Sequence, residues 1–329
     1  MGYGRWREND FRRYSSAAGR SIRDDGSIDT TAYGGSAQKM YSQRGIAAEL
    51  NPYKVIRECC ETEEHPNSLP VITALDVTGS MGPAAIEVAG KLGIVMKDIY
   101  GMGKDVEFMV MGIGDLAYDR APIQIGQFES DIRVAEQLDK IYFEGGGGGN
   151  RYESYTAAWY MAARHTKLDC LARGCRGVII TLGDEPLNPY LPQKRLEELT
   201  GDRLQGDVET ADLLREVRER YEVYHIFVRH GGNYYEAEAR KSFGKYLDRK
   251  HLYFCRVEEI AKTITDIVNR EQKRSDGERF LQKDTVNAAA AEDHPDENEN
   301  IAWNEAVKEE KEGEPGRKGF LGFLQSIAW

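Results

Sequence analysis

The sequence contains no apolar run that approaches the roughly 20 residues a helix needs to cross a bilayer. Its first ten residues, MGYGRWREND, are polar and lack the apolar core of a signal peptide. Positive charge is in deficit, because 44 Lys and Arg residues face 55 Asp and Glu residues and leave a net charge of -11 at pH 7. So acidic a chain is not expected to bind nucleic acid in general. We therefore expect a cytoplasmic protein without a transmembrane segment.

Cysteine is scarce, and its spacing argues against two common uses. The five cysteines form an odd set with one adjacent pair, which is not a disulfide framework. No CxxC pair occurs, which argues against a structural zinc site. With 40% hydrophobic residues the 329-residue chain can still fill a core without cross-links. We expect reduced thiols, in the core or in loops, at Cys59, Cys60, Cys170, Cys175 and Cys255.

Sequence signatures of several enzyme classes are also missing. The chain has no GxxxxGKS or GxxxxGKT phosphate loop, no HExxH zinc motif and no protein-kinase motif. These absences favour a binding role over a catalytic one for the polar residues that the chain does carry.

The most informative stretch that is present is VITALDVTGSMG, Val71 to Gly82. Its first five residues are apolar and partly β-branched, as in a buried strand. An apolar helical pattern begins after Pro83. Asp76, Thr78 and Ser80 are therefore expected on a loop at the carboxyl end of a strand, where open α/β sheets bind ligands.

Three uses of this loop are open. Carboxylate and hydroxyl oxygens suit Mg²⁺, Mn²⁺ or Ca²⁺ rather than soft metals. The start of the following helix could instead hold a phosphate, although the loop has no Lys. Alternatively, Thr78 or Ser80 could simply cap the helix. A cap needs one hydroxyl, however, and does not explain Asp76 or the second hydroxyl.

The rest of the chain alternates strands and helices. This order predicts an α/β fold of three layers, with a doubly wound, mostly parallel sheet, helices on both faces and one antiparallel edge strand. The edge strand is expected at residues 122–128, where apolar and polar residues alternate. The other expected strands are residues 71–75, 106–115, 177–183, 222–230 and 251–257, and the expected helices are residues 52–60, 84–100, 131–138, 152–165, 193–199, 210–221 and 257–271.

Two further loops carry polar residues. The apolar strand GVIITLG is followed by Asp184, which repeats the arrangement at Asp76. Residues 145–149 are five consecutive glycines, followed by Asn150, and must form a loop rather than a regular element. His225 and His230 are five residues apart on an expected strand, so they point to opposite faces and are interpreted as ordinary strand histidines.

DVTGS resembles the DxSxS signature of von Willebrand factor A (vWA) domains, with Thr78 in place of the first serine. In that family the motif opens a metal-ion-dependent adhesion site (MIDAS) on a Rossmann-like fold. The resemblance implies that Thr78 and Ser80 bind the cation directly and that Asp76 acts mainly through water. Asp184 matches the aspartate of the third loop of such a site.

The second loop of the site resembles a particular branch of the family. EGGGGGNRYES is similar to the GGGDxPE loop of intracellular members related to alpha-kinases, and the preceding MGIGDLAYDRAPIQIGQF is similar to their strand and hairpin. Asn150 occupies the position of the acid in this loop and could give a carbonyl oxygen. The resemblance covers about residues 69–270 and implies the metal-site residues Asp76, Thr78, Ser80, Asp184 and Asn150.

The ends of the chain differ from its centre. We expect an N-terminal arm and short helix over residues 1–66, a vWA domain over residues 67–272, and an acidic linker with an apolar C-terminal docking peptide over residues 273–329. The arm alternates arginines and aromatics, and could bind RNA, anionic lipid or an acidic protein face, or pack on its own domain. The final GRKGFLGFLQSIAW could dock on a partner or on its own domain, contact a membrane surface, or pack as an ordinary terminal helix.

Two functions are open at this point. The first is an interaction module whose bound Mg²⁺, Mn²⁺ or Ca²⁺ takes a carboxylate from a protein partner. For it, the resemblance implies assembly or chaperone-like work in a cytoplasmic complex, often beside an ATPase of the AAA+ class. The second is a metal-dependent hydrolase or phosphoryl-transfer enzyme that uses the same loops, with Asp115 or Glu185 as a base.

Overall fold

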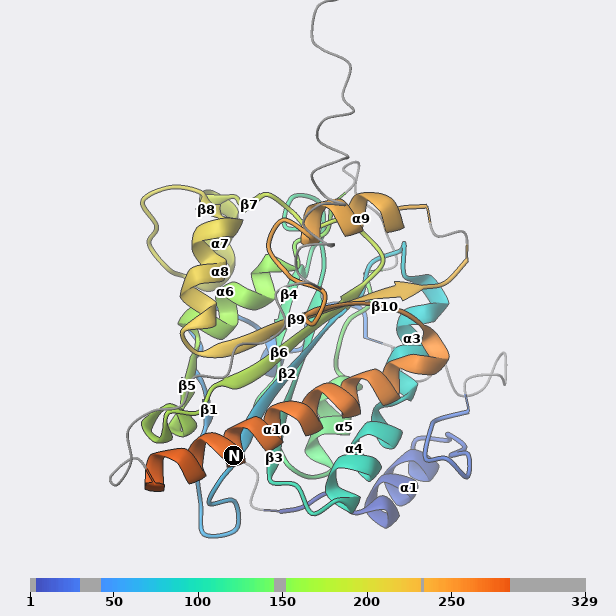
Figure 1. Ribbon diagram of the computed structural model, residues 1–329. Coiled ribbons are helices and arrows are strands. Elements are labelled where there is room, and N and C mark those ends of the chain that lie inside the picture. Colours follow the sequence, from blue (N-terminus) through green and yellow to red (C-terminus); the bar gives the residue numbers. More distant parts are fainter. Residues whose placement is uncertain (1–3, 30–42, 145–151, 232–233, 285–329) are drawn as a thin grey trace, which may run out of the picture. The chain divides into compact units, whose positions relative to one another are not determined.

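The computed structural model describes residues 4–29, 43–144, 152–231 and 234–284 (Figure 1). Asn150, the glycines before it, and the expected docking peptide lie outside these ranges.

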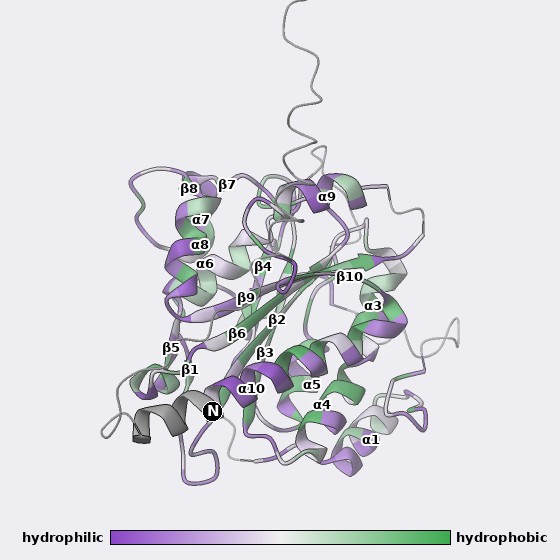
Figure 2. Cartoon of the chain, viewed as in Figure 1, coloured by the Kyte–Doolittle hydropathy of each residue, from purple (hydrophilic) through white to green (hydrophobic). Residues whose placement is uncertain are grey.

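A six-stranded sheet forms the centre of the described domain (Figure 1). Its strand order is β10-β9-β6-β2-β3-β4, and neighbouring strands are parallel except for β3 and β4. The apolar runs of the sequence form the buried central strands, which are largely green in Figure 2. The three-layer fold class with an antiparallel edge strand is confirmed. The strands are β2 (Leu69–Asp76), β3 (Val106–Ile113), β4 (Ile123–Ile125), β6 (Gly177–Gly183), β9 (Tyr221–Arg229) and β10 (Leu252–Arg256).

Helices cover both faces of this sheet, because successive strand side chains point to opposite sides. Val71 and Leu75 of β2 belong to the apolar cluster of one face, and Ile72 and Ala74 belong to that of the other. The first face is covered by α1 (Glu8–Ala17), α3 (Gly82–Gly90), α4 (Leu92–Gly101), α5 (Arg133–Leu138) and α10 (Ile260–Asp284), and the second by α6 (Thr156–Arg164), α7 (Gln193–Thr200), α8 (Thr210–Arg218) and α9 (Glu236–Phe243).

The helix expected over residues 84–100 is two helices that meet at Lys91. Ile28 of the N-terminal arm donates its backbone N–H to the carbonyl of Gly90 at 3.0 Å, so this carbonyl is used outside the helix. Gly93 permits the close approach, because a β-carbon there would overlap the backbone of the arm. The arm therefore docks where the helical pattern is interrupted.

The described part of the arm packs on the domain. Trp6 and Phe11 are buried in the same apolar cluster as α4. The guanidinium of Arg20 pairs with Asp139 at 2.7 Å, and the two side chains are only 4% and 13% exposed. The hydroxyl of Tyr14 donates to the same carboxylate at 2.6 Å. Among the roles open to the arm, packing on its own domain is the one that these contacts show.

The helix expected over residues 52–60 is wrong. Residues Arg57–Cys59 form strand β1, which pairs in parallel with β5 (Thr166–Leu168). The Arg57 backbone N–H donates to the carbonyl of His165 at 2.8 Å. Because the partner strand lies far along the sequence, local periodicity does not indicate the pairing. The remaining short elements are β7 (Tyr190–Leu191), β8 (Val208–Glu209) and the 3-10 helices η1 (Ala48–Leu50), η2 (Asp169–Arg173) and η3 (Val257–Glu259).

Neither cross-links nor membrane spans contribute to the described fold. All five cysteines are free, and all but Cys60 are buried. Within the described ranges, no helix has both the length and the apolarity needed to cross a membrane.

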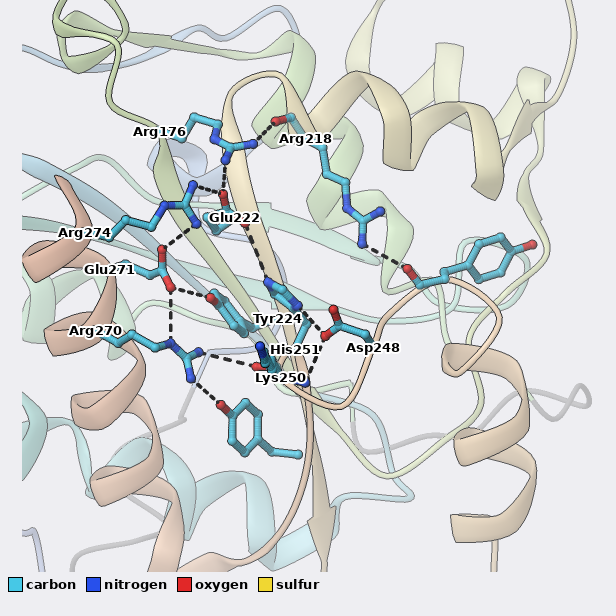
Figure 3. Close-up of polar contacts among 12 residues, drawn as sticks. Arg176, Arg218, Glu222, Tyr224, Asp248, Lys250, His251, Arg270, Glu271 and Arg274 are labelled. Atoms are coloured by element: carbon cyan, nitrogen blue, oxygen red, sulfur yellow. Dashed lines mark hydrogen bonds and ion pairs between the residues drawn. The ribbon is translucent and has the colours of Figure 1, made fainter. Parts of the chain in front are cut away.

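Helix α10 is joined to the sheet by a network of ion pairs and hydrogen bonds (Figure 3). Glu222 on β9 pairs with Arg176, just before β6, and with Arg274 of α10 at 2.6 Å. The hydroxyl of Tyr224 on the same strand donates to Glu271 of α10 at 2.6 Å. These contacts hold α10 beyond residue 271, where the sequence predicts its end, and the helix continues to Asp284.

The network shifts the titration of its central carboxylate. Burial alone would raise the pKa of Glu222, but interactions with His251 and Arg274 and the charge of Arg176 lower that pKa to about 2. Because this value is below the ordinary 4.5, the carboxylate stabilises the fold at pH values above 4.5. The contribution is lost as the pH falls towards about 2.

We expect Glu222→Gln to lower the free energy of unfolding at neutral pH by about 2 kcal/mol, because it removes charge-assisted hydrogen bonds to two arginines. Urea denaturation followed by circular dichroism measures the loss, and Glu209→Gln, at an exposed position of β8, is the control. The difference from the wild type should be smaller at about pH 3 than at about pH 6. A difference that does not change with pH would contradict this role of the carboxylate.

Candidate metal centre

Asp76 and Asp184 stand at the carboxyl ends of two neighbouring strands. Asp76 is the last residue of β2, and Asp184 directly follows β6. After β2 the chain forms β3 on one side of that strand, and β6 lies on the other side. The two acids therefore flank the point where the connections diverge, which is where open α/β sheets bind ligands.

The DVTGS loop folds around the carboxylate of Asp76. The Oδ1 atom accepts hydrogen bonds from the backbone N–H of Thr78 at 3.0 Å and from its hydroxyl at 2.6 Å. The next strand holds the loop in place, because the Val77 N–H donates to the carbonyl of Ile113 at 2.9 Å. The buried acid thus shapes the loop that presents the hydroxyls.

The oxygens of three loop side chains lie at the spacing of a metal coordination shell. The hydroxyl oxygens of Thr78 and Ser80 are 3.1 Å apart, and the Ser80 hydroxyl lies 2.9 Å from Oδ1 of Asp184. Adjacent ligands of an octahedral Mg²⁺ at about 2.1 Å from the metal are about 3.0 Å apart. Hydrogen bonds link these oxygens, and the same separations would suit three neighbouring ligands.

Tyr155, which directly precedes α6, orients the carboxylate of Asp76. Its hydroxyl donates to Oδ2 of Asp76 at 2.8 Å and accepts the backbone N–H of Glu185 at 3.2 Å. Gly183 leaves space for the ring, because a β-carbon there would overlap the Tyr155 hydroxyl. Such outer contacts commonly fix the orientation of metal-binding carboxylates.

His230 performs the same task for Asp184, and the expectation that it lies on the strand is wrong. Strand β9 ends at Arg229, and His230 lies beyond it with Nε2 2.9 Å from Oδ2 of Asp184. This hydrogen bond raises the pKa of His230. His225, by contrast, is buried in β9 and stacks on Phe243 with ring centres 3.7 Å apart.

Negative charge is crowded at this site. Burial raises the pKa of Asp76 above its ordinary value, and the charge of Asp184 raises it further. Burial and the charges of the same two acids raise the pKa of Glu185 to about 7. The pKa of Glu153 is raised well above its usual range by burial and then by the charges of Asp76 and Glu185. A bound cation would relieve this repulsion.

Glu153, whose backbone N–H donates to the carbonyl of Pro186 at 3.3 Å in the loop after Asp184, also carries a buried carboxylate. Its side chain is 4% exposed, and within the described residues its Oε2 atom has no hydrogen-bond partner. No group of three or more His, Cys, Asp or Glu side chains in the described ranges is arranged to hold a metal. The candidate metal centre would use only one such residue, Asp184, as a direct ligand, because its other two ligands are the hydroxyls of Thr78 and Ser80. The donor set therefore fits a hard cation through hydroxyl oxygens and one carboxylate.

The structure brings together Asp76, Thr78, Ser80 and Asp184, while Asn150 lies outside the described residues and stays a prediction. Sequence reasoning missed Glu153, Tyr155 and His230. Glu153 had a signal, since it is the first acid after the glycine run. Nothing local indicated Tyr155 or His230, because their partners come from distant strands.

Comparisons with solved structures find similar domains at low identity. The pilus adhesin SpaC from Lactobacillus rhamnosus GG, in its open conformation, gives a TM-score of 0.47 and 10% identity over 68% of this chain, which spans 31% of the adhesin. The vWF domain of the type V pili tip protein Mfa5 from Porphyromonas gingivalis gives 0.39 and 11% over 69% of this chain and 98% of that domain. The SpRpn10 VWA domain gives 0.37 and 10% over 61% of this chain and 94% of that one.

No family model and no curated protein matches the sequence. At these identities and TM-scores the similar structures say nothing about function. The fold class rests instead on the strand order and the layers described above.

We expect Mg²⁺ to raise the melting temperature of the wild type, because a ligand at 100 times its Kd stabilises the folded state by about 2.7 kcal/mol. Thr78→Ala with Ser80→Ala removes two oxygen ligands without changing the charge, and should abolish the shift. Differential scanning fluorimetry with and without Mg²⁺ measures it. The control is Ser21→Ala with Thr263→Ala, two hydroxyls on other elements, which should keep the shift. A shift that persists in the first variant would place the cation elsewhere.

Proposed function

We propose that this chain is a metal-dependent protein-interaction module. A Mg²⁺, or a Mn²⁺ or Ca²⁺ in its place, would be held by Thr78, Ser80 and Asp184. Asp76 would act from the second layer, and Asn150 could add an oxygen. The observation that carries the proposal is the chain of side-chain oxygens from Thr78 Oγ1 to Asp184 Oδ1, with steps of 3.1 and 2.9 Å.

The residues would prepare the site for one further anionic ligand. Thr78 and Ser80 are neutral, so they hold a cation without cancelling its charge. Asp76 is fully buried and accepts two hydrogen bonds from Thr78, which keeps its charge one layer behind the hydroxyls. When bound, the cation would supply a positive centre with an open position, and Mg²⁺ commonly leaves such positions to water or to a partner carboxylate. An Asp or Glu of a protein partner suits that position.

The resemblance of DVTGS to the vWA signature supports the same function and suggests where it operates. In that family the corresponding site commonly serves protein assembly, and intracellular members often act beside AAA+ ATPases. We therefore propose a cytoplasmic complex as the setting and an ATPase of that class as one candidate partner.

One observation favours a second candidate, a metal-dependent hydrolase or phosphoryl-transfer enzyme. Glu185 adjoins Asp184, and burial together with nearby acids gives it a pKa of about 7, which suits a general base. Asp115, the other candidate base, accepts the N–H of Ala117 in a turn at 2.8 Å. The interaction module is preferred because the chain lacks the enzyme motifs that usually accompany such chemistry.

Asp184→Asn tests the two candidates, because it removes a ligand charge while nearly preserving shape. For an interaction module, we expect pull-downs in Mg²⁺ to retain a partner on the wild type but not on Asp184→Asn, with EDTA releasing it. Asp266→Asn, on the exposed side of α10, should behave as the wild type. Turnover of p-nitrophenyl phosphate or a p-nitrophenyl ester that depends on Mg²⁺ and falls in Asp184→Asn, without any stable complex, would instead support the enzyme.

A further inference from the structure

Exposed tyrosines gather around the candidate metal centre. Seven large hydrophobic side chains are exposed in the described residues. Four are tyrosines on the segments that follow the strands at the carboxyl edge of the sheet: Tyr118, Tyr152, Tyr190 and Tyr234, which are 58%, 44%, 43% and 85% exposed. The other three, Tyr53, Ile56 and Met102, lie on other segments.

Each of these four tyrosines is close in sequence to a residue of the site or to an element that supports it. Tyr118 lies between β3 and β4, within the turn closed by Asp115 and Asp119. Tyr152 directly precedes Glu153. Tyr190 begins β7, after the loop that carries Asp184, and Tyr234 lies between His230 and α9.

The loops that carry the tyrosines are bonded to one another. The Leu116 N–H donates to the hydroxyl of Ser154 at 3.0 Å, which joins the Tyr118 loop to the Tyr152 loop. Glu153 forms a parallel bridge with Leu187, three residues before Tyr190. The Leu187 N–H in turn donates to the hydroxyl of Ser242 on α9 at 3.0 Å, which ties in the element that follows Tyr234. The four side chains therefore belong to one rim, which we call the tyrosine rim.

The rim surrounds a group of acidic side chains. The linked loops carry six acids: Asp76, Asp115, Asp119, Glu153, Asp184 and Glu185. The chain as a whole carries a net charge of -11 at pH 7. Tyrosine faces attract Lys and Arg side chains, and the net negative charge of the chain attracts them over a longer range. Tyrosine and arginine are also the residues that most often dominate binding energy in protein interfaces.

We propose that the partner presents one metal-binding Asp or Glu within a segment that is otherwise basic, and that its Arg or Lys side chains lie against the tyrosine rim. This inference rests on the proposed function, because it describes the surroundings of the same carboxylate. The tyrosine rim and the acids near it favour binding of a basic segment. The cation favours one Asp or Glu within that segment. A wholly acidic segment would satisfy the cation but would be repelled by the acids around it.

A displayed library of twelve-residue peptides tests the composition of the partner. The peptides carry a fixed central Glu and random flanks, are selected on the full chain in Mg²⁺, and are eluted with EDTA. We expect Arg and Lys to be enriched in the flanks and Asp and Glu to be depleted. Flanks that are neutral or acidic, or a library from which EDTA elutes nothing, would overturn the proposal.

The best peptide is then measured against variants by fluorescence anisotropy. Tyr→Ser at all four rim positions should weaken it at least about tenfold. Tyr53→Ser with Ile56→Ser and Met102→Ser, which changes the other exposed hydrophobic residues, should leave its affinity unchanged. Equal affinity for the rim variant would also overturn the proposal.

Two readouts separate a failure of this inference from a failure of the proposed function. The rim variant should keep the Mg²⁺-dependent rise in melting temperature, because it retains Thr78, Ser80 and Asp184. Replacing the central Glu of the peptide by Gln should abolish binding to the wild type. If both results hold while the rim variant still binds the peptide, the metal bridge stands and the tyrosine rim is not part of the interface.

Discussion

The crowding of carboxylates at the carboxyl edge of the central sheet is the constraint on which the site depends. Parallel pairing of β2 with β6 fixes how Asp76 and Asp184 approach each other. Their repulsion is tolerated because each is held by a specific donor: Tyr155 and Thr78 bond to Asp76, while Ser80 and His230 contact Asp184. Two of these donors, the hydroxyls of Thr78 and Ser80, are also the groups that would bind the cation.

The rest of the domain supports this arrangement. Tyr155 can enter beside Asp76 because Gly183 has no side chain, and α6, which begins one residue later, is buried along most of its length. His230 depends on the end of β9, the strand that the Glu222 network ties to α10. Residues far from the loops therefore help to hold the elements that carry the loops.

Much of the fold and part of the site could be predicted from the sequence, for local reasons. Buried parallel strands are continuous apolar runs, and DVTGS is a contiguous motif, so both are visible without knowledge of the rest. What failed depends on distant pairing: Arg57–Cys59 becomes a strand only through β5. His230 acquires its partner only through the packing of β9 beside β6. The interruption at Lys91 lies where the distant arm bonds to the carbonyl of Gly90.

The central claim is that Thr78, Ser80 and Asp184 bind a divalent cation directly. An anomalous difference map from crystals of the protein grown with Mn²⁺ tests it most directly. The account predicts a peak within about 2.5 Å of the Thr78 and Ser80 hydroxyl oxygens and of one Asp184 oxygen, with Asp76 outside the first shell. A peak bound to other residues, or none at this edge of the sheet at saturating Mn²⁺, would contradict it.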